Sequence, residues 1–286
     1  MLNTILKSHS KINLFLNVGQ KNKNSKLHNI QSLVCLTNIH DKITVSKIKS
    51  SNDIIKFYGK FSNYVNKKNN SVSKCLSLLR AKGIIKKNEN YKIVVEKNIP
   101  VFSGFGGGSS NASNLIKYFT KDRKLNEKDI SYFCKNLGSD CRLFFGSKNV
   151  FQKSLNKVVN IKKKFNFYFI LIYPFLRSST KDIYSKVKVY QNFAKQHLIK
   201  NNSRSKIIEY LKKKENSLQG IVIKKYPLTK KILHELRSIR NCKFSRVTGS
   251  GSACFGLFLT KKSAVLGLKK IKKKFPKFWC VIGKTI

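Results

Sequence analysis

The sequence predicts an α+β fold arranged in two domains. Its 286 residues are 41% hydrophobic, which is enough to bury one large core or two modest ones. Strand-like and helix-like patterns occur in both halves of the chain, and the pattern breaks near residues 156–166. We therefore place an N-terminal domain at residues 1–156 and a C-terminal domain at residues 157–286.

The first half opens with a strand. Polar and apolar residues alternate from Lys11 to Val18, which predicts a strand with one polar face. Further along, apolar residues recur at helical spacing from Val72 to Leu79, and Gly83 is a suitable C-terminal stop. The elements expected in this half are strands at 30–36, 43–48, 54–58 and 91–97 and helices at 71–82, 112–119 and 127–137.

The second half starts again with a strand. The apolar run Phe167–Tyr173 predicts a buried strand that Pro174 stops. A later strand, Phe244–Val247, enters a second glycine-rich turn, Thr248–Ser252. The other elements expected here are helices at 180–187, 207–213 and 229–239, a strand at 253–259, and a helix followed by a strand at 278–282.

Two classes of protein are disfavoured by the composition. No stretch approaches the roughly 18 consecutive apolar residues of a membrane span, and the first residues lack the apolar core of a signal peptide, so we expect a cytoplasmic protein. The seven cysteines are an odd number, are scattered, and form no C-x-x-C pair. The sequence therefore indicates neither a zinc site nor a disulfide framework.

The charge is extreme, with 60 Lys and Arg against 12 Asp and Glu and a formal net charge of +48. One interpretation is a polyanion-binding protein, because Lys and Arg clusters neutralise nucleic-acid phosphates. The other is compositional drift, since Lys, Asn, Ile and Ser are enriched along the whole chain. The even spread of basic residues favours drift, so we do not expect a nucleic-acid partner. The charge still attracts nucleotides and phosphorylated substrates.

A glycine-rich segment, Gly104–Asn111, is the strongest local signal. Four glycines in five positions weaken a strand or a helix, which indicates close approach of the backbone to a ligand. A strand precedes the segment and an amphipathic helix follows it, with Ser109 or Ser110 near the helix cap. Backbone N–H groups at such a helix start bind phosphates, and the two hydroxyls are available to phosphate oxygens or Mg²⁺. The alternative is a flexible surface turn.

Other nucleotide-binding signatures do not fit the chain. A Walker A loop that ended at Gly283-Lys284-Thr285 would have Phe278 where its first glycine belongs. A dinucleotide fingerprint that began at Gly104 would have Ser109 where its third glycine belongs. The H-R-D and D-F-G motifs of protein kinases are absent from the sequence. The glycine segment is therefore a phosphate loop of another kind.

Phosphoryl transfer needs charge stabilisation, alignment and a group that takes the proton of the acceptor hydroxyl. Asp140 is a candidate for that group, because it lies in a tight turn between a helix and the apolar segment Leu143–Phe145, which we expect to be a strand. Its alternative role is that of an ordinary turn residue. Lys11 lies on the same face of the first strand as Asn13, and a lysine beside a carboxylate base keeps that base ionised and polarises the hydroxyl.

Four segments together resemble the successive motifs of the GHMP kinases. They occur in the family's order and span nearly the full chain: Ser10–Leu16, Ile99–Ala112, Leu137–Asp140 and Thr248–Ala253. The resemblance implies an N-terminal domain similar to domain 2 of ribosomal protein S5. It also implies a ferredoxin-like α+β C-terminal domain.

The same resemblance implies an activity and site residues. The implied reaction is ATP-dependent phosphorylation of the 2-hydroxyl of a cytidine-diphosphate-linked methylerythritol, in the non-mevalonate route to isoprenoid precursors. The catalytic residues would be Lys11 and Asp140. The substrate would be held by Asn13, His28, Thr180 and Tyr184, with an aromatic ring stacked on cytosine. The ATP loop would consist of Pro100, Val101, Phe102, Ser103, Gly104, Phe105, Gly106, Gly107, Gly108, Ser109 and Ser110. Mg²⁺ is expected with ATP, and its ligands and the oligomeric state stay unassigned.

Several residues depart from the family pattern. Leu27 stands where an aromatic residue usually precedes the histidine, and Phe102 and Ser103 stand where glycines are usual. Arg142 replaces a proline, and Asn216-Ser217-Leu218 replaces Asn-Asp-Leu. These departures concern cytidine binding and rate more than reaction class. Two alternatives stay open, another GHMP kinase for mevalonate-like or homoserine-like alcohols, and a polyanion-binding protein that retains the kinase fold.

Overall fold

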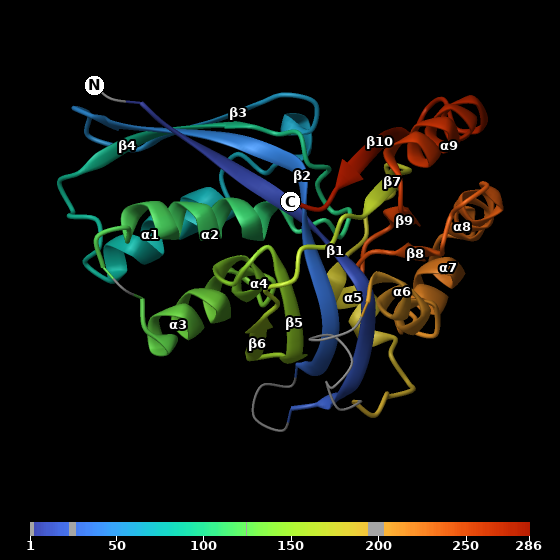
Figure 1. Ribbon diagram of the computed structural model, residues 1–286. Coiled ribbons are helices and arrows are strands. Elements are labelled where there is room, and N and C mark those ends of the chain that lie inside the picture. Colours follow the sequence, from blue (N-terminus) through green and yellow to red (C-terminus); the bar gives the residue numbers. More distant parts are fainter. Residues whose placement is uncertain (1–2, 23–26, 124, 194–202) are drawn as a thin grey trace. The chain divides into compact units, whose positions relative to one another are not determined.

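The computed structural model describes residues 3–22, 27–123, 125–193 and 203–286 (Figure 1). These residues form two compact units that are interleaved in sequence. The first comprises Met1–Ser10, Ile39–Val101 and Gly106–Phe145, and the second Lys11–Asn38, Phe102–Phe105 and Gly146–Ile286. Two long strands, β1 (Thr4–Lys21) and β2 (His28–Ile48), contribute residues to both units. The domain boundary between residues 156 and 157 stays a prediction.

The first unit is a sheet covered by helices. Strand β4 (Asn90–Glu96) pairs antiparallel with the C-terminal part of β2 and parallel with β3 (Ile54–Tyr58). Helices α1 and α2 lie along one face of this sheet (Figure 1), and their apolar sides join the strands in one core. The helical elements of the unit are η1 (Ser62–Tyr64), α1 (Ser71–Ala81), α2 (Gly107–Phe119), α3 (Glu127–Leu137) and α4 (Cys141–Phe145).

The predicted helix at 71–82 is confirmed as α1, and its ends have clear local causes. The Asn70 side chain accepts hydrogen bonds from the backbone N–H groups of Val72 and Ser73, so it caps the first turn. Gly83 follows the helix with φ of 65°, a left-handed conformation that glycine adopts without a steric penalty. The predicted strands at 54–58 and 91–97 are confirmed as β3 and β4.

One expectation for this region is confirmed within a longer element, and another is wrong. The strands expected at 30–36 and 43–48 are parts of one strand, β2, because the residues between them include neither glycine nor proline and the backbone stays extended. The segment Leu143–Phe145, expected as a strand, belongs to the short helix α4. Its first turn is set by hydrogen bonds from the N–H groups of Cys141, Arg142 and Leu143 to the carbonyls three residues earlier.

The second unit contains an antiparallel sheet with strand order β10-β7-β9-β8. If the four strands are counted along the chain from β7 as the first to β10 as the fourth, their order in the sheet is 4-1-3-2. Helices follow the first and the third of these strands, so the arrangement is ferredoxin-like. Helices α8 and α9 cover one face of this sheet (Figure 1). The strands and helices of this part of the second unit are β7 (Tyr168–Tyr173), α5 (Thr180–Ser185), α6 (Arg204–Lys212), α7 (Gln219–Lys225), α8 (Leu228–Ser238), β8 (Ser245–Val247), β9 (Cys254–Phe258), α9 (Lys261–Lys274) and β10 (Trp279–Lys284).

The second unit also contains strands β5 (Asn149–Ser154) and β6 (Lys157–Asn160). Strand β5 pairs with the N-terminal part of β2, at Ser32–Cys35, and β6 pairs with β5. The sequence did not predict β5, β6 or α7, which are all short. The first strand, predicted at Lys11–Val18, is confirmed within β1, but both of its faces are buried, including the polar one. No helix among the described residues is long and apolar enough to cross a membrane.

Candidate active site

The glycine segment forms the start of α2 in the first unit. Gly106 precedes the helix with φ of 73°, and its carbonyl accepts the N–H of Ser110 over 2.9 Å. The helix therefore begins at Gly107 with Gly106 as its N-cap, and Ser109 and Ser110 lie in its first turn, near the cap as expected. A left-handed glycine turns the chain sharply enough to start the helix without a side-chain cap.

The first turn of α2 is suited to an anion. Gly108 is exposed, and a Cβ atom there would lie 3.4 Å from Ser71 Oγ, so the N-termini of α1 and α2 are neighbours. Neither helix has an acidic residue in its first turn. Two helix dipoles and free backbone N–H groups therefore favour negative charge at this point. Ser109 is half-buried, whereas Ser110 is fully buried and accepts a hydrogen bond from Ser8 Oγ over 2.9 Å.

A buried ion pair fixes the chain just before the loop. The Lys97 ammonium donates to the Asp41 carboxylate, and both side chains are almost fully buried. The other carboxylate oxygen accepts the N–H groups of Asn98 and Ile99 over 2.8 Å each. These bonds satisfy the buried charges, and they hold the end of β4 immediately ahead of Pro100. A Cβ atom on Gly107 would lie only 3.2 Å from Lys97 Nζ, so the ammonium also abuts the start of α2.

Asp140 lies half-buried in the turn that joins α3 to α4. The following residue, Cys141, is anchored to α2: its carbonyl accepts from Ser113 Oγ over 3.1 Å, and its Sγ donates to the Ser109 carbonyl over 3.7 Å. Burial raises the pKa of Cys141 to about 12, so this thiol is a packing group. The carboxylate is therefore held on a segment that is tied to the first turns of the glycine helix.

Arg142, the residue that departs from the family's proline, has a structural role. Its guanidinium pairs with the Glu127 carboxylate and donates to Ser131 Oγ over 2.7 Å. The guanidinium thus links α4 to α3 on either side of the Asp140 turn. We infer that it replaces the rigidity of a proline ring with two polar contacts.

In the second unit, Lys11 begins a chain of buried hydrogen bonds. Its ammonium donates to Asn13 Oδ1 over 2.6 Å, and both side chains are 2% exposed. Asn13 Nδ2 donates to Ser32 Oγ over 2.8 Å, and that hydroxyl donates to the Phe15 carbonyl over 2.6 Å. The chain fixes the orientation of the Lys11 side chain. A buried cation with a defined direction can polarise a hydroxyl or stabilise a developing negative charge.

The second glycine turn packs directly against this pair. Thr248 Oγ1 accepts the N–H of Asn13 over 3.2 Å, and a Cβ atom on Gly249 would lie 3.2 Å from Lys11 Nζ. The turn is held by Asn216, whose Nδ2 donates to the carbonyls of Val247 and Gly249 over 2.9 and 2.8 Å. Asn216 is buried, so these bonds are shielded from water.

The segment Phe102–Phe105 crosses the same turn at close range. A Cβ atom on Gly104 would overlap the Thr248 carbonyl oxygen, and one on Gly251 would overlap the Ser103 carbonyl. The N–H of Ala253 donates to the Ser103 carbonyl over 3.2 Å. Only glycines permit this approach of two backbones.

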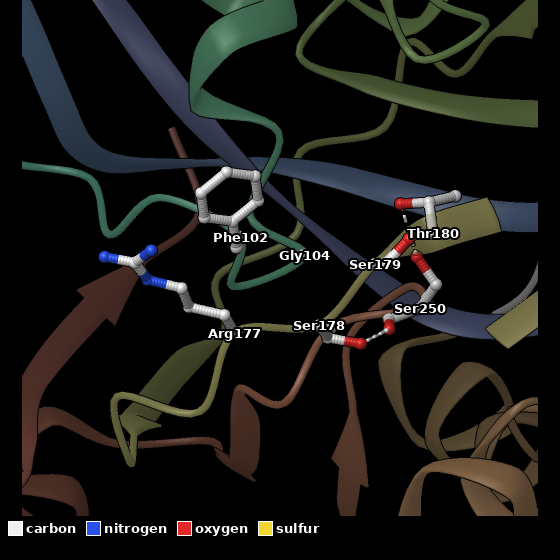
Figure 2. Close-up of a pocket in the computed structure, with 8 residues that line it drawn as sticks. Phe102, Gly104, Arg177, Ser178, Ser179, Thr180 and Ser250 are labelled. Atoms are coloured by element: carbon white, nitrogen blue, oxygen red, sulfur yellow. Dashed lines mark hydrogen bonds between the residues drawn. The ribbon is translucent and has the colours of Figure 1, made fainter. Parts of the chain in front are cut away.

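A cavity of about 390 Å³ opens beside this crossing (Figure 2). Ser250 Oγ donates to Thr180 Oγ1 over 3.0 Å, and Ser178 Oγ donates to the Ser250 carbonyl over 2.7 Å. No acidic residue is among its lining residues, which are Phe102, Gly104, Arg177, Ser178, Ser179, Thr180, Ser250 and Gly251.

His28 lies in a cluster of aromatic rings. Its ring centroid is 5.7 Å from that of Tyr184 and 5.7 Å from that of Tyr190, with interplanar angles of 33° and 36°. Its Nδ1 is 3.3 Å from the Gly19 carbonyl oxygen, so it donates there in the tautomer that carries the proton on Nδ1. Leu27 is more than half exposed, and Tyr190 supplies an exposed ring beside the histidine.

The structure brings together most of the residues predicted from the sequence within each unit. In the second unit Lys11 contacts Asn13, His28 contacts Tyr184, and three predicted residues line the cavity: Phe102, Gly104 and Thr180. Phe105 is buried there, and its carbonyl accepts the N–H of Lys11 over 2.9 Å. The residues Pro100, Val101, Gly106–Ser110 and Asp140 belong to the first unit. Asp41, Arg177 and Tyr190 were not predicted from the sequence, and Asn216 was noted only as part of a variant motif.

Comparisons with known proteins match both halves of the chain. Residues 70–144 match the family model described as GHMP kinases N terminal domain, and residues 196–277 match the GHMP kinases C terminal model. A 4-diphosphocytidyl-2-C-methyl-D-erythritol kinase of Pelagibacter ubique is 36% identical over 285 residues, 98% of each chain. A kinase of the same name from Wolbachia pipientis is 29% identical over 96% of each chain. A crystal structure of 4-(cytidine 5'-diphospho)-2C-methyl-D-erythritol kinase superposes with a TM-score of 0.71 at 20% identity, covering 99% of this chain and all of that one.

The fold and the two family models define a GHMP kinase, a small-molecule kinase that uses ATP, and confirm the predicted two-domain α+β class. Within this class, the chain belongs to the family of 4-diphosphocytidyl-2-C-methyl-D-erythritol kinases.

Proposed function

We propose that this protein transfers the γ-phosphoryl group of ATP to the 2-hydroxyl of 4-diphosphocytidyl-2-C-methyl-D-erythritol, in the non-mevalonate route to isoprenoid precursors. The observation that carries the proposal is the 36% identity over 98% of the chain to a kinase of that name. The oriented Lys11–Asn13 pair and the anion-suited start of α2 support the same chemistry.

We assign the proton transfer to Asp140 and the polarisation of the hydroxyl to Lys11. The acceptor hydroxyl gives its proton to the Asp140 carboxylate, and its oxygen forms the new bond to the γ-phosphorus. The bond from that phosphorus to the β–γ bridging oxygen breaks, and ADP leaves. The Lys11 ammonium stabilises the negative charge that the acceptor oxygen develops, and the N–H groups from Gly106 to Ser109 stabilise the charge of the phosphates.

The residues present fit Mg²⁺ that is bound together with ATP. Among the residues that the structure describes, no group of three or more His, Cys, Asp and Glu side chains could hold a metal ion. Mg²⁺ in kinases keeps several waters and is held by substrate phosphates with one or two protein groups. Near the glycine helix the Ser109 hydroxyl and the Asp140 carboxylate are of the right chemistry. The ion would neutralise phosphate charge during transfer.

The aromatic cluster supports a cytidine-containing acceptor. Beside the buried His28, Tyr184 and Tyr190 have rings that can stack on a pyrimidine, and stacking of a base on an aromatic ring contributes about 1–3 kcal/mol. We propose that Tyr190 compensates for the aliphatic Leu27. Thr180 and Asn13 would donate or accept hydrogen bonds to the acceptor.

The test is release of ADP that depends on the acceptor. Purified protein whose folded state is verified by circular dichroism is incubated with ATP, Mg²⁺ and 4-diphosphocytidyl-2-C-methyl-D-erythritol, with mevalonate and homoserine in parallel reactions. We expect ADP only with the first acceptor. Turnover with mevalonate or homoserine instead would assign the protein to another alcohol substrate, and no turnover with any acceptor would contradict the proposal.

A further inference from the structure

Phe102 holds an unusual conformation at the edge of the cavity. Its φ of 59° is left-handed, which an L-residue with a large side chain adopts at a steric cost. Its side chain is nevertheless 51% exposed, so burial of the ring offsets that cost only in part. Backbone strain of this kind persists where the surrounding structure imposes it, and it is concentrated at functional sites.

The surroundings that impose this conformation are visible in the structure. The Phe102 carbonyl accepts the N–H of Ser178 over 3.4 Å, and the next residues are locked against the second glycine turn at Gly251. The ring is therefore presented by a fixed backbone on one side of the cavity. Figure 2 shows the Phe102 ring and the Arg177 guanidinium on the same side of Gly104, with the Thr180 and Ser250 hydroxyls on the other.

The chemistry of the cavity selects one kind of ligand. A guanidinium binds phosphate oxygens in a bidentate manner, and hydroxyl and backbone N–H groups add further donors. An exposed aromatic ring stacks on a flat base or covers a sugar. The volume of about 390 Å³ lies within the range of small-molecule sites. A phosphate-bearing nucleoside matches all of these features.

We propose that Arg177 and Phe102 are specificity-determining residues that bind a nucleoside diphosphate group, Arg177 through phosphate oxygens and Phe102 through its ring. This inference rests on the proposed function in that both substrates of the reaction, ATP and the cytidine-linked acceptor, contain such a group. It adds Arg177 to the site, and it assigns a role to the ring of Phe102, an expected ATP-loop residue that stands where the family usually has glycine.

The chain offers matched controls for both residues. Phe175 has nearly the same conformation, with φ of 60°, but its ring packs on Tyr173 at 5.3 Å and does not line the cavity. Arg240 is exposed and also lies outside the cavity, so its replacement removes one charge without touching the lining. The test compares Phe102→Gly with Phe175→Gly, and Arg177→Gln with Arg240→Gln.

Binding of ADP and of CDP to each full-length variant is measured by titration calorimetry, and melting temperatures are measured in parallel. We expect Arg177→Gln to weaken at least one of the two nucleotides roughly tenfold. Phe102→Gly should weaken the same nucleotide about fivefold without lowering the melting temperature, because glycine relieves the left-handed strain. The two controls should bind both nucleotides as the wild type does.

The pattern of losses identifies the source of the diphosphate. Weakened CDP binding alone assigns the cavity to the acceptor, and weakened ADP binding alone assigns it to ATP, and either result supports the inference. Unchanged binding of both nucleotides in Arg177→Gln and Phe102→Gly overturns it, as does an equal loss in the control variants. Wild-type protein that binds nucleotide but shows no acceptor-dependent turnover would refute the proposed function and leave this inference standing.

Discussion

The Lys11 ammonium donates to Asn13 Oδ1 over 2.6 Å in a site that is almost closed to solvent. A flexible lysine side chain is thereby held in one direction by its neighbour two residues along the same strand. The bond from Asn13 to Ser32 extends the restraint to β2. This arrangement orients the cation before any substrate is bound.

The orientation of Lys11 can be tested through its neighbour. Lys11→Met should lower kcat by about 10²-fold or more, because the charge that polarises the hydroxyl is lost. Ser32→Ala should have a smaller effect of about threefold to tenfold, because it loosens Asn13 and leaves the ammonium in place. Steady-state ADP release measures both. Equal losses in the two variants would show that Ser32 acts in another way than through Asn13.

Asp140→Asn should lower kcat by about 10²–10⁴-fold, because an amide does not accept the proton of the acceptor hydroxyl. The affinity for ATP should change little, since the start of α2 is intact. Asp122→Asn, an exposed aspartate of the same unit, is the matched control and should leave kcat unchanged. Full activity of Asp140→Asn in a single-turnover experiment would assign the base to another group.

Tyr190→Ala should raise the KM of the cytidine-linked acceptor by about tenfold, because the ring beside His28 is removed. The KM of ATP and kcat should stay close to those of the wild type. Tyr58 in β3 is also about half exposed, so Tyr58→Ala controls for the loss of a surface tyrosine. A rise in the KM of ATP in place of that of the acceptor would contradict the assignment of this cluster to cytidine.

Gly251→Ala should destabilise the protein by about 1–3 kcal/mol or prevent folding, because the added methyl group overlaps the Ser103 carbonyl. Gly220 in α7 has open space around it, so Gly220→Ala should be neutral or stabilise by about 0.5–1 kcal/mol. Urea unfolding compares the two variants. Equal free energies of unfolding for Gly251→Ala and Gly220→Ala would mean that the Phe102–Phe105 and Thr248–Ser252 segments can move apart at little cost.

The rate at which iodoacetamide alkylates Cys242 should keep rising at pH values where an ordinary thiol has reached its maximum rate. Burial raises the pKa of this thiol to about 11, so the thiolate fraction near pH 8 is roughly a thousandth. The iodoacetamide rate at Cys242, measured by mass spectrometry of its peptide, should still rise above pH 9 in the folded protein, whereas in urea it should level off near 9. A rate that levels off near pH 9 in the folded protein would contradict the raised pKa of Cys242. The raised pKa stabilises the fold below the unfolded pKa, and this contribution is lost as pH rises through about 11.

The sequence was informative where a local pattern decides the structure. The glycine segment, the strand before it and the helix after it are visible in consecutive residues, and so is the helix α1 that Gly83 follows. The short helix α4 could not be predicted, because five residues are too few to distinguish a helical period from that of a strand.

The residues that sequence analysis missed act across long separations in the chain. Asp41 meets Lys97 because β2 and β4 pair with Lys42 opposite Glu96, and one sequence does not reveal that register. Tyr190 reaches His28 from a segment more than 150 residues away, as the two residue numbers show. Arg177 resembles any other surface arginine until the cavity beside it is known. The residues of the site that lie in sequence motifs could therefore be predicted, whereas the residues that support them from distant parts of the chain could not.

The crossing of the two glycine-rich segments has a consequence for how the second unit responds to a ligand. Because Gly104 and Gly251 leave no gap between the backbones, a displacement of the Phe102–Phe105 segment moves the Thr248–Ser252 turn with it. The other end of that turn, at Gly249, adjoins the Lys11 ammonium. We therefore expect a ligand that displaces the Phe102–Phe105 segment to perturb the surroundings of the Lys11 ammonium as well.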